Sequence, residues 1–220
     1  VDALHTITTF DVNSPDFKKA VEAILRLQEE KNSGISTYNG ISMEALIERD
    51  WERKNNKVKT GDRRLDDLLL GGIPSGSNIA IYGPPFTGKE VTTNTFIADG
   101  LIKGIPAIYI LTDKLVDDVR QEMEFILREG EIKKYEKNGL LHYIDAYSQS
   151  IGFEENCKQA TLVDDPRNMF EILDVVCPIA DSMFHKHGTY RLVFRGLSEL
   201  ITETNIEKTL DFLKKFANNQ

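Results

Sequence analysis

The sequence has little of what would assign it to a specialised class of protein. Its only two cysteines, Cys157 and Cys177, match no metal-ligand spacing and give no disulfide framework. No apolar run approaches the roughly 20 residues that a membrane span needs, and the N-terminus lacks a signal-peptide layout. The sequence also lacks an excess of positive charge: 27 Lys and Arg stand against 35 Asp and Glu, a net charge of −8, whereas a large nucleic-acid footprint needs clustered Lys and Arg. We therefore expect a protein of the reducing cytoplasm, with neither a membrane nor a nucleic acid as its partner.

The remaining composition is that of a globular chain. Apolar residues make up 40% and charged residues 28% of the sequence. A length of 220 residues suffices for one domain with a sizeable core, or for one domain and a small appendage. The chain begins at Val1 rather than at an initiator methionine, as expected of a trimmed chain or a fragment.

The first quarter of the sequence predicts helices. Residues 13–34 place Ser14 at an N-cap, Pro15 in the first turn and Gly34 just past the end, with an apolar stripe at helical period between them. This helix is expected to pack on the main body or to bind a partner. Residues 42–56 predict a second helix. A linker-like stretch follows, so we predict a helical N-terminal appendage over 1–56 and a core domain over 57–220.

From Val58 onward the pattern alternates between strand and helix. Strands are predicted over 77–83, 105–112 and 139–147 and within 189–200; helices are predicted over 92–104, 113–130, 167–188 and 205–220. The run 105–112 is continuously apolar and rich in isoleucine, as in a parallel strand covered on both faces. This alternation predicts an α/β fold with a parallel sheet flanked by helices, and ligands at the carboxyl ends of the strands.

A glycine-rich stretch follows the first predicted strand of the core and opens the next helix. "IYGPPFTGKE", residues 81–90, has the spacing of a phosphate-binding loop: glycine, four residues, glycine, lysine. Such a loop works because backbone N–H groups converge on an anion at a helix N-terminus, and lysine adds a positive charge. The predicted nucleotide-binding residues are Gly83, Pro84, Pro85, Phe86, Thr87, Gly88, Lys89 and Glu90.

The region around this loop resembles the KaiC-like branch of the RecA superfamily of P-loop ATPases. The resemblance lies in the Thr60-Gly61 start, the Leu65-Asp66 pair, the turn over 71–74 and Gly76 before the loop. It continues in "AIYILTD", "LLHYIDAYSQSIG" and "YRLVFRGLSELI", and covers roughly residues 58–213. Residues before Lys57 show a fainter likeness to the linker that precedes the core of archaeal RadA-type recombinases. The resemblance implies a RecA-like P-loop NTPase fold, ATP or ADP as ligand, and self-association.

The sequence departs from this family at the positions that the resemblance assigns to hydrolysis. The hydroxyl that should follow the loop lysine and ligate Mg²⁺ is replaced by Glu90. The aspartate that should end the fourth strand is replaced by Arg195, and the glutamate pair after the second strand corresponds to Asp113 and Lys114, leaving one doubtful catalytic carboxylate, Asp113. Inside the loop, Phe86 replaces a small residue, so its ring is expected to crowd the phosphates.

Opposite charges at the two former metal positions suggest an ion pair. We therefore expect Glu90 and Arg195 to form a salt bridge that fills the metal site, because the planar guanidinium of arginine suits a carboxylate. An unpaired Glu90 would instead repel a triphosphate by about 4 kcal/mol per unit charge at ~4 Å and an effective dielectric of about 20. If Arg195 turned toward the nucleotide instead of toward Glu90, it could replace part of the metal's charge and allow nucleotide to bind without a metal. Either orientation of Arg195 predicts no metal site and slow or absent Mg²⁺-dependent hydrolysis.

The predicted function is that of a degenerate KaiC-like relative, a pseudo-ATPase that regulates or scaffolds through protein contacts or a homo-oligomer and binds nucleotide weakly or not at all. One alternative is an ATP-binding enzyme that tolerates these changes through residues such as Asp113. Another is a recombinase paralogue that acts on DNA. Members of the family usually continue past the helix over 205–220, so the C-terminus is missing, the domain is shortened, or another chain completes the sheet.

Overall fold

The computed structural model describes residues 37–38, 40–165, 168–198 and 206–218. The chain divides into two units, 1–47 and 48–220. In the described part of the first unit, β1 (Thr37–Tyr38) pairs antiparallel with β2 (Ile41–Ser42). The hydroxyl of Ser42 then accepts a hydrogen bond from the backbone of Ala45, in the first turn of helix α3 (Met43–Asn55). The predicted helix over 13–34 lies outside the described residues, and the predicted boundary at residue 56 remains a prediction.

The second unit is built on a parallel sheet whose strand order is β7-β6-β5-β8. These strands are β5 (Ala107–Leu111), β6 (Leu141–Asp145), β7 (Ala160–Leu162) and β8 (Arg191–Arg195). Leu111 is in register with Asp145 on one side and with Arg195 on the other, so these strand ends meet at one edge of the sheet. The predicted α/β class with a parallel sheet is confirmed.

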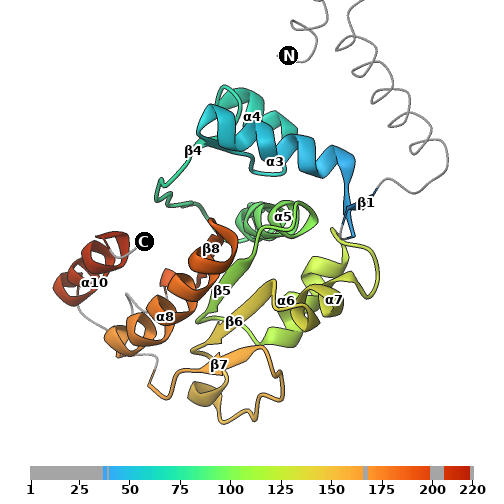
Figure 1. The fold of residues 1–220 in the computed structure, drawn as a ribbon. Helices are drawn as coiled ribbons and strands as arrows, with labels where there is room; N and C mark the ends of the chain where they lie inside the picture. The colour runs from blue at the N-terminus through green and yellow to red at the C-terminus, as the bar shows by residue number, and fades with distance from the viewer. Residues whose placement is uncertain (1–36, 39, 166–167, 199–205, 219–220) are drawn as a thin grey trace, which may run out of the picture. The chain divides into compact units, whose positions relative to one another are not determined.

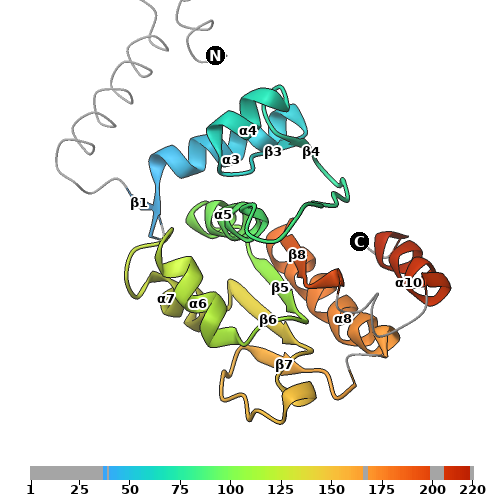
Figure 2. The same cartoon turned by 180° about the vertical axis from the view of Figure 1, so that it is seen from behind.

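Helices cover both faces of this sheet (Figures 1 and 2). One face carries α5 (Lys89–Ile102), α6 (Val116–Glu124) and α7 (Glu131–Lys137); the other carries α8 (Met169–His187) and α10 (Ile206–Asn218). Successive side chains of β5 alternate between the two cores: Tyr109 packs with the first set of helices and Ile110 with the second. All five residues of β5 are buried, which explains the uninterrupted apolar run in its sequence.

A small lobe precedes the phosphate-binding loop. It comprises β3 (Lys57–Val58), paired antiparallel with β4 (Ile73–Pro74), and the short helix α4 (Arg63–Leu68) between them. The buried carboxylate of Asp66 accepts hydrogen bonds from the backbone and the hydroxyl of Thr60, at 2.8 and 2.9 Å. These bonds fix the turn at Gly61, where an added Cβ would lie 2.9 Å from Thr95 and Asp99 of α5. The Thr-Gly and Leu-Asp pairs of the sequence therefore hold this lobe close to α5.

Most predicted helices and strands are present, with shifted ends. The structure contains seven of the predicted elements. In chain order they are α3 (predicted over 42–56), α5 (92–104), β5 (105–112), β6 (139–147), α8 (167–188), β8 (within 189–200) and α10 (205–220). The helix predicted over 113–130 is the shorter α6. The other described elements were not predicted; α7, β7 and a 3-10 turn over Gln149–Ile151, for example, carry too few residues for their periodicity to stand out in the sequence.

The strand predicted over 77–83 is absent from the structure. These residues form no regular structure and pair with no described strand. Ile79 and Ile81 are about half exposed, and Tyr82 is fully exposed. An apolar run becomes a strand only where a neighbouring strand supplies hydrogen-bond partners and a covered face, and these residues have neither. The prediction was wrong because it rested on the apolar pattern alone.

Candidate functional site

The candidate site lies where β5 and β8 end and α5 begins. Thr112 and Asp113 follow β5, and the Thr112 hydroxyl donates a hydrogen bond of 2.8 Å to the backbone carbonyl of Arg195, the last residue of β8. Gly196 follows with φ +79°, and an added Cβ there would lie 2.8 Å from the Cβ of Asp113. Glycine at this position therefore lets the two strand ends approach each other closely, which brings Asp113 and Arg195 together.

The buried Arg195 is the centre of a partly buried ion-pair cluster. Its guanidinium forms a two-pronged contact with Glu122 of α6, at 2.6 and 3.3 Å, and a third contact with Asp113 at 3.3 Å. Lys114 donates to the same carboxylate of Glu122 at 2.5 Å. We call these four residues the Arg195 cluster. Two cations and two carboxylates balance one another, so the cluster is neutral as it stands.

The predicted salt bridge between Glu90 and Arg195 is wrong. Arg195 binds Glu122 and Asp113 instead, and no ion pair joins Glu90 to any described residue. Glu90 lies in the first turn of α5, where unsatisfied backbone N–H groups and the helix dipole favour a negative charge without a cationic partner. Glu122 reaches Arg195 from the neighbouring helix, a partner that a comparison with P-loop positions alone does not suggest.

The surroundings of Glu122 favour its ionised form. Desolvation by burial would raise its pKa, but hydrogen bonds from Arg195, Lys114 and Asn94 outweigh this and hold the pKa at about 2. Asn94 of α5 donates to Glu122 at 3.0 Å and accepts from the hydroxyl of Tyr109 in β5 at 2.5 Å. A hydrogen-bonded chain therefore runs from the sheet through α5 to the Arg195 cluster.

The predicted phosphate-binding loop leads directly into α5. Lys89 donates to the backbone carbonyls of Gly83 and Pro84, at 3.0 and 2.6 Å, and the Thr87 hydroxyl also donates to Pro84, at 2.8 Å. Gly88 precedes the helix with φ +85°, a conformation that favours glycine. Lys89 thus folds across its own loop, and an incoming phosphate would compete with two carbonyl oxygens for its ammonium group.

The other residues of the loop are largely open to water. Pro84, Pro85, Phe86 and Thr87 are exposed, and the Phe86 side chain is fully exposed. Phe86 also has φ 62°, a left-handed conformation that costs a residue with a side chain about 1 kcal/mol or more. Its ring extends into solvent, so the expectation that it crowds a bound phosphate stays a prediction.

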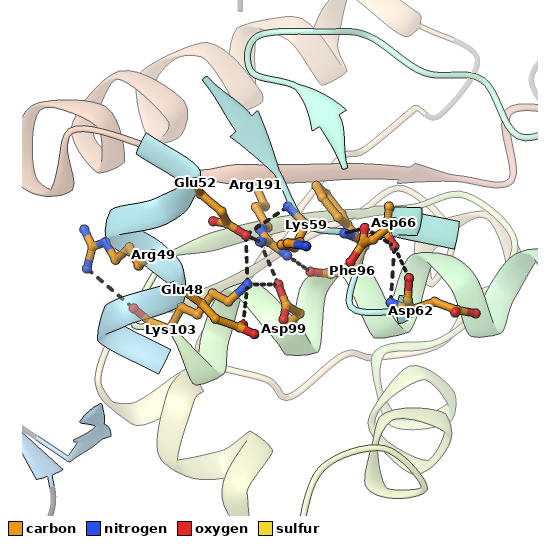
Figure 3. A network of polar contacts seen from close by, with 11 residues as sticks. Glu48, Arg49, Glu52, Lys59, Asp62, Asp66, Phe96, Asp99, Lys103 and Arg191 are labelled. Atoms are coloured by element: carbon orange, nitrogen blue, oxygen red, sulfur yellow. Dashed lines mark hydrogen bonds and ion pairs between the residues drawn. The ribbon is translucent and has the colours of Figure 1, made fainter. Parts of the chain in front are cut away.

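A second buried network anchors the other end of α5 (Figure 3). Lys103, only 1% exposed, donates to Glu52 of α3 and Asp99 of α5, both at 2.8 Å. Arg191 of β8 contacts the same two carboxylates at 3.3 and 2.8 Å. Burial would lower the pKa of Lys103, but its hydrogen bonds to Asp99 and Glu52 outweigh this and raise it. The network ties α5 to α3 and β8, and it lies outside the loop.

The place that the resemblance assigns to Mg²⁺ does not suit a divalent cation. A guanidinium stands at the strand end, and its carboxylate neighbours are already neutralised by Arg195 and Lys114. Within the described residues, no group of three or more His, Cys, Asp and Glu side chains could hold a metal ion. Mg²⁺ requires oxygen-rich coordination, and the only two carboxylates of this cluster are already occupied by two cationic side chains.

Glu122, Asn94 and Tyr109 are the residues of this site that the sequence analysis missed. Asn94 is 2% exposed on the otherwise apolar buried side of α5, and Tyr109 is buried in an apolar strand. A polar side chain at a core position needs a hydrogen-bond partner. A polar residue within an apolar pattern was therefore a detectable signal for Asn94 and Tyr109. Glu122 carried none, because it is one of several acidic residues on α6.

Comparison with known proteins identifies the family. The sequence model of the KaiC ATPases matches residues 58–205, which include the phosphate-binding loop and the Arg195 cluster. The chain belongs to the KaiC family of ATPases. The predicted resemblance to KaiC-like proteins of the RecA superfamily is thereby confirmed.

Relatives of this KaiC-family chain include UPF0273 proteins from several organisms. A UPF0273 protein of Aeropyrum pernix is 31% identical over 121 residues, covering 55% of this chain and 48% of the relative. A UPF0273 protein of Thermotoga maritima is 34% identical over 119 residues, covering 53% and 48%. The match therefore spans about half the length of these relatives.

A crystal structure of a KaiC-like protein from Pyrococcus horikoshii has the same fold. It superposes with a TM-score of 0.56 at 24% identity, covering 72% of this chain and 64% of that chain.

None of the described helices is long and apolar enough to cross a membrane.

Proposed function

We propose that this KaiC-family chain is a pseudo-ATPase that acts through protein contacts rather than through hydrolysis. The observation that carries the proposal is the Arg195 cluster, in which Glu122 and Asp113 neutralise an arginine where hydrolysis needs a metal. Phosphoryl transfer relies on divalent cations to neutralise charge on the β and γ oxygens of the nucleotide. With Arg195 engaged by two carboxylates and Glu90 at the hydroxyl position, neither residue supplies that chemistry.

Weak nucleotide binding without a metal fits the loop better than tight binding does. Gly83, Gly88 and Lys89 are the groups that would meet a phosphate, and α5 begins there. Against this, Lys89 must leave two carbonyl oxygens, and the carboxylate of Glu90 lies in the first turn of the same helix. We therefore expect any affinity for ATP or ADP to be low and to respond little to Mg²⁺.

An active ATPase is the competing proposal. It is supported by the intact glycine and lysine spacing and by Asp113, whose Oδ1 is buried and has no hydrogen-bond partner among the described residues. That oxygen could accept a proton from a water molecule. The contact between Arg195 and the other oxygen of the same carboxylate disfavours this role, because it ties the Asp113 side chain to the Arg195 cluster.

Titration calorimetry and a phosphate-release assay separate the two proposals. Wild type, Lys89→Ala and the control Lys133→Ala, an exposed lysine on α7, are titrated with ATP and ADP with and without Mg²⁺. We expect Mg²⁺ to change the affinity less than about threefold and phosphate release to stay at the level of Lys89→Ala. Steady Mg²⁺-dependent release that is lost in Lys89→Ala and kept in Lys133→Ala would establish the active enzyme instead.

A further inference from the structure

The carboxylate of Glu122 lies within a set of donors that suits an oxyanion. Arg195 donates to it at 2.6 and 3.3 Å, Lys114 at 2.5 Å and Asn94 at 3.0 Å. Guanidinium, ammonium and amide N–H groups are donors with which proteins bind carboxylates and phosphates. These donors come from the end of β8, the residues after β5 and helix α5, whereas Glu122 belongs to α6. Glu122 therefore fills a site that other elements build.

The Glu122 side of this site is open to water. The side chain of Arg195 is 6% exposed, whereas those of Glu122 and Lys114 are 27% and 41% exposed. The site also lies near the predicted phosphate-binding loop, because about one and a half turns of α5 separate Lys89 from Asn94. An anion that enters from solution or from the loop would meet Glu122 as a competitor for the same donors.

We propose that Glu122 is an autoinhibitory residue: its carboxylate occupies a binding site for a phosphate chain and keeps the affinity of that site low. The ligand class is a pyrophosphate group without a metal, either free or as part of a nucleotide, whose oxygens take over the hydrogen bonds of Glu122. Charge supports this role, because the Arg195 cluster is neutral with Glu122 in place. Once Glu122 leaves, two cations face Asp113 alone, two positive charges against one negative, and the net charge is +1. This role of Glu122 rests on the proposed function, in which no metal occupies the cluster.

Titration calorimetry with metal-free pyrophosphate tests the competition. The matched variants are Glu122→Ala and Asp113→Ala: each removes one negative charge from the cluster, but only Glu122→Ala frees the donors. We expect Glu122→Ala to bind pyrophosphate at least about tenfold more tightly than wild type, because charged donors gain a new acceptor, and Asp113→Ala to gain less than about threefold. Absence of a gain in Glu122→Ala, or equal gains in both variants, would overturn the proposal.

Two further measurements locate the site and identify the source of the phosphate chain. Adding Arg195→Met to Glu122→Ala should abolish the gain; a gain that survives would place the anion elsewhere and overturn the proposal. Titrations with ADP and ATP repeat the comparison. A gain shared by nucleotides and pyrophosphate shows that the site accepts a nucleotide, whereas a gain for pyrophosphate alone assigns it to a free phosphate chain. Both outcomes keep Glu122 as the competitor.

A second variant covers the case in which Glu122→Ala does not fold, as judged by circular dichroism. Glu122→Gln keeps the shape of the side chain, but a neutral amide accepts more weakly from a guanidinium than a carboxylate does. It should therefore tighten pyrophosphate binding by about threefold or more, and an unchanged affinity would contradict autoinhibition. These titrations contain no metal and measure no turnover. Mg²⁺-dependent phosphate release by wild type would refute the proposed pseudo-ATPase without changing them, so the two failures are distinguishable.

Discussion

At the residue scale, the Arg195 cluster depends most on Glu122, which contacts both of its cations. The Glu122→Gln variant keeps the shape of the side chain but leaves Arg195 with Asp113 alone and Lys114 without its carboxylate partner. Losing one member of a buried ion pair costs more than the pair contributes, because a desolvated charge remains. Glu122 is 27% exposed, which softens this effect. We expect the free energy of unfolding at pH 7 to fall by about 2 kcal/mol, measured by urea denaturation.

The pH dependence of this loss distinguishes ionisation from packing. The pKa of Glu122 in the folded chain is about 2, below its ordinary value of 4.5, so its contribution is complete above pH 4.5 and disappears as the pH falls toward 2. The stability difference between wild type and Glu122→Gln should therefore shrink over that interval. Glu124→Gln, an exposed glutamate on the same helix, should change stability by less than about 0.5 kcal/mol. A difference independent of pH would show that Glu122 acts through packing.

At the element scale, α5 is held at its far end by the buried network around Lys103. The Lys103→Met variant preserves the apolar stem of the side chain but leaves Glu52 and Asp99 with the single guanidinium of Arg191 and removes the lysine partner of Glu48. Because Lys103 is 1% exposed, we expect a loss of about 3 kcal/mol in the free energy of unfolding.

The matched control for Lys103→Met is Lys54→Met, which removes an exposed lysine paired with Asp50 within α3. Exposed ion pairs within one helix contribute little to stability, so this variant should unfold almost as wild type does. If Lys103→Met proved as stable as the control, the network would be dispensable, and apolar packing alone would hold α5 against α3 and β8.

The difference between β5 and segment 77–83 marks the limit of sequence reasoning about elements. Both are short apolar runs with isoleucine, and both were predicted to be strands. Ala107–Leu111 is buried between two helical layers with a strand on each side, whereas Ile79 and Ile81 pair with none of the strands that the structure describes. The pattern predicts which residues can form a strand. Whether they do depends on which edges the rest of the chain leaves for them, and that is a property of the tertiary structure.

The same limit applies to the candidate site. The spacing of Gly83, Gly88 and Lys89 predicted the loop, and the loop does lead into α5. Arg195, which stands where the family has an aspartate, predicted a cation at the end of the fourth strand. The structure places its buried guanidinium there, at the end of β8. Its partner could not be predicted, because Glu122 lies 73 residues from Arg195 and reaches it only once α6 packs beside the sheet. Local motifs predict positions along the chain, and contacts between distant residues need the fold.

At the scale of the whole molecule, charge decides between a scaffold and a recombinase paralogue. The net charge of −8 opposes approach to a polyanion over the whole surface. The exposed pair Arg63 and Arg64 opens α4, but Asp66 and Asp67 follow in the same helix, so this cationic pair is balanced locally. Counterion release by clustered cations supplies most of the affinity in sequence-independent DNA binding, and this balance leaves few cations to contribute.

We therefore expect no measurable binding of single- or double-stranded DNA at about 150 mM salt, and a nearly flat dependence on salt between about 50 and 200 mM. Fluorescence anisotropy of labelled DNA over that range measures both quantities. The informative variant is Arg63→Glu with Arg64→Glu: if any binding at low salt is lost in this variant, it came from these two side chains. Affinity that rises steeply as salt is lowered and survives the double substitution would require a cationic surface elsewhere on the chain. That result would favour the recombinase paralogue over the scaffold, because a protein that acts on DNA must first neutralise phosphates.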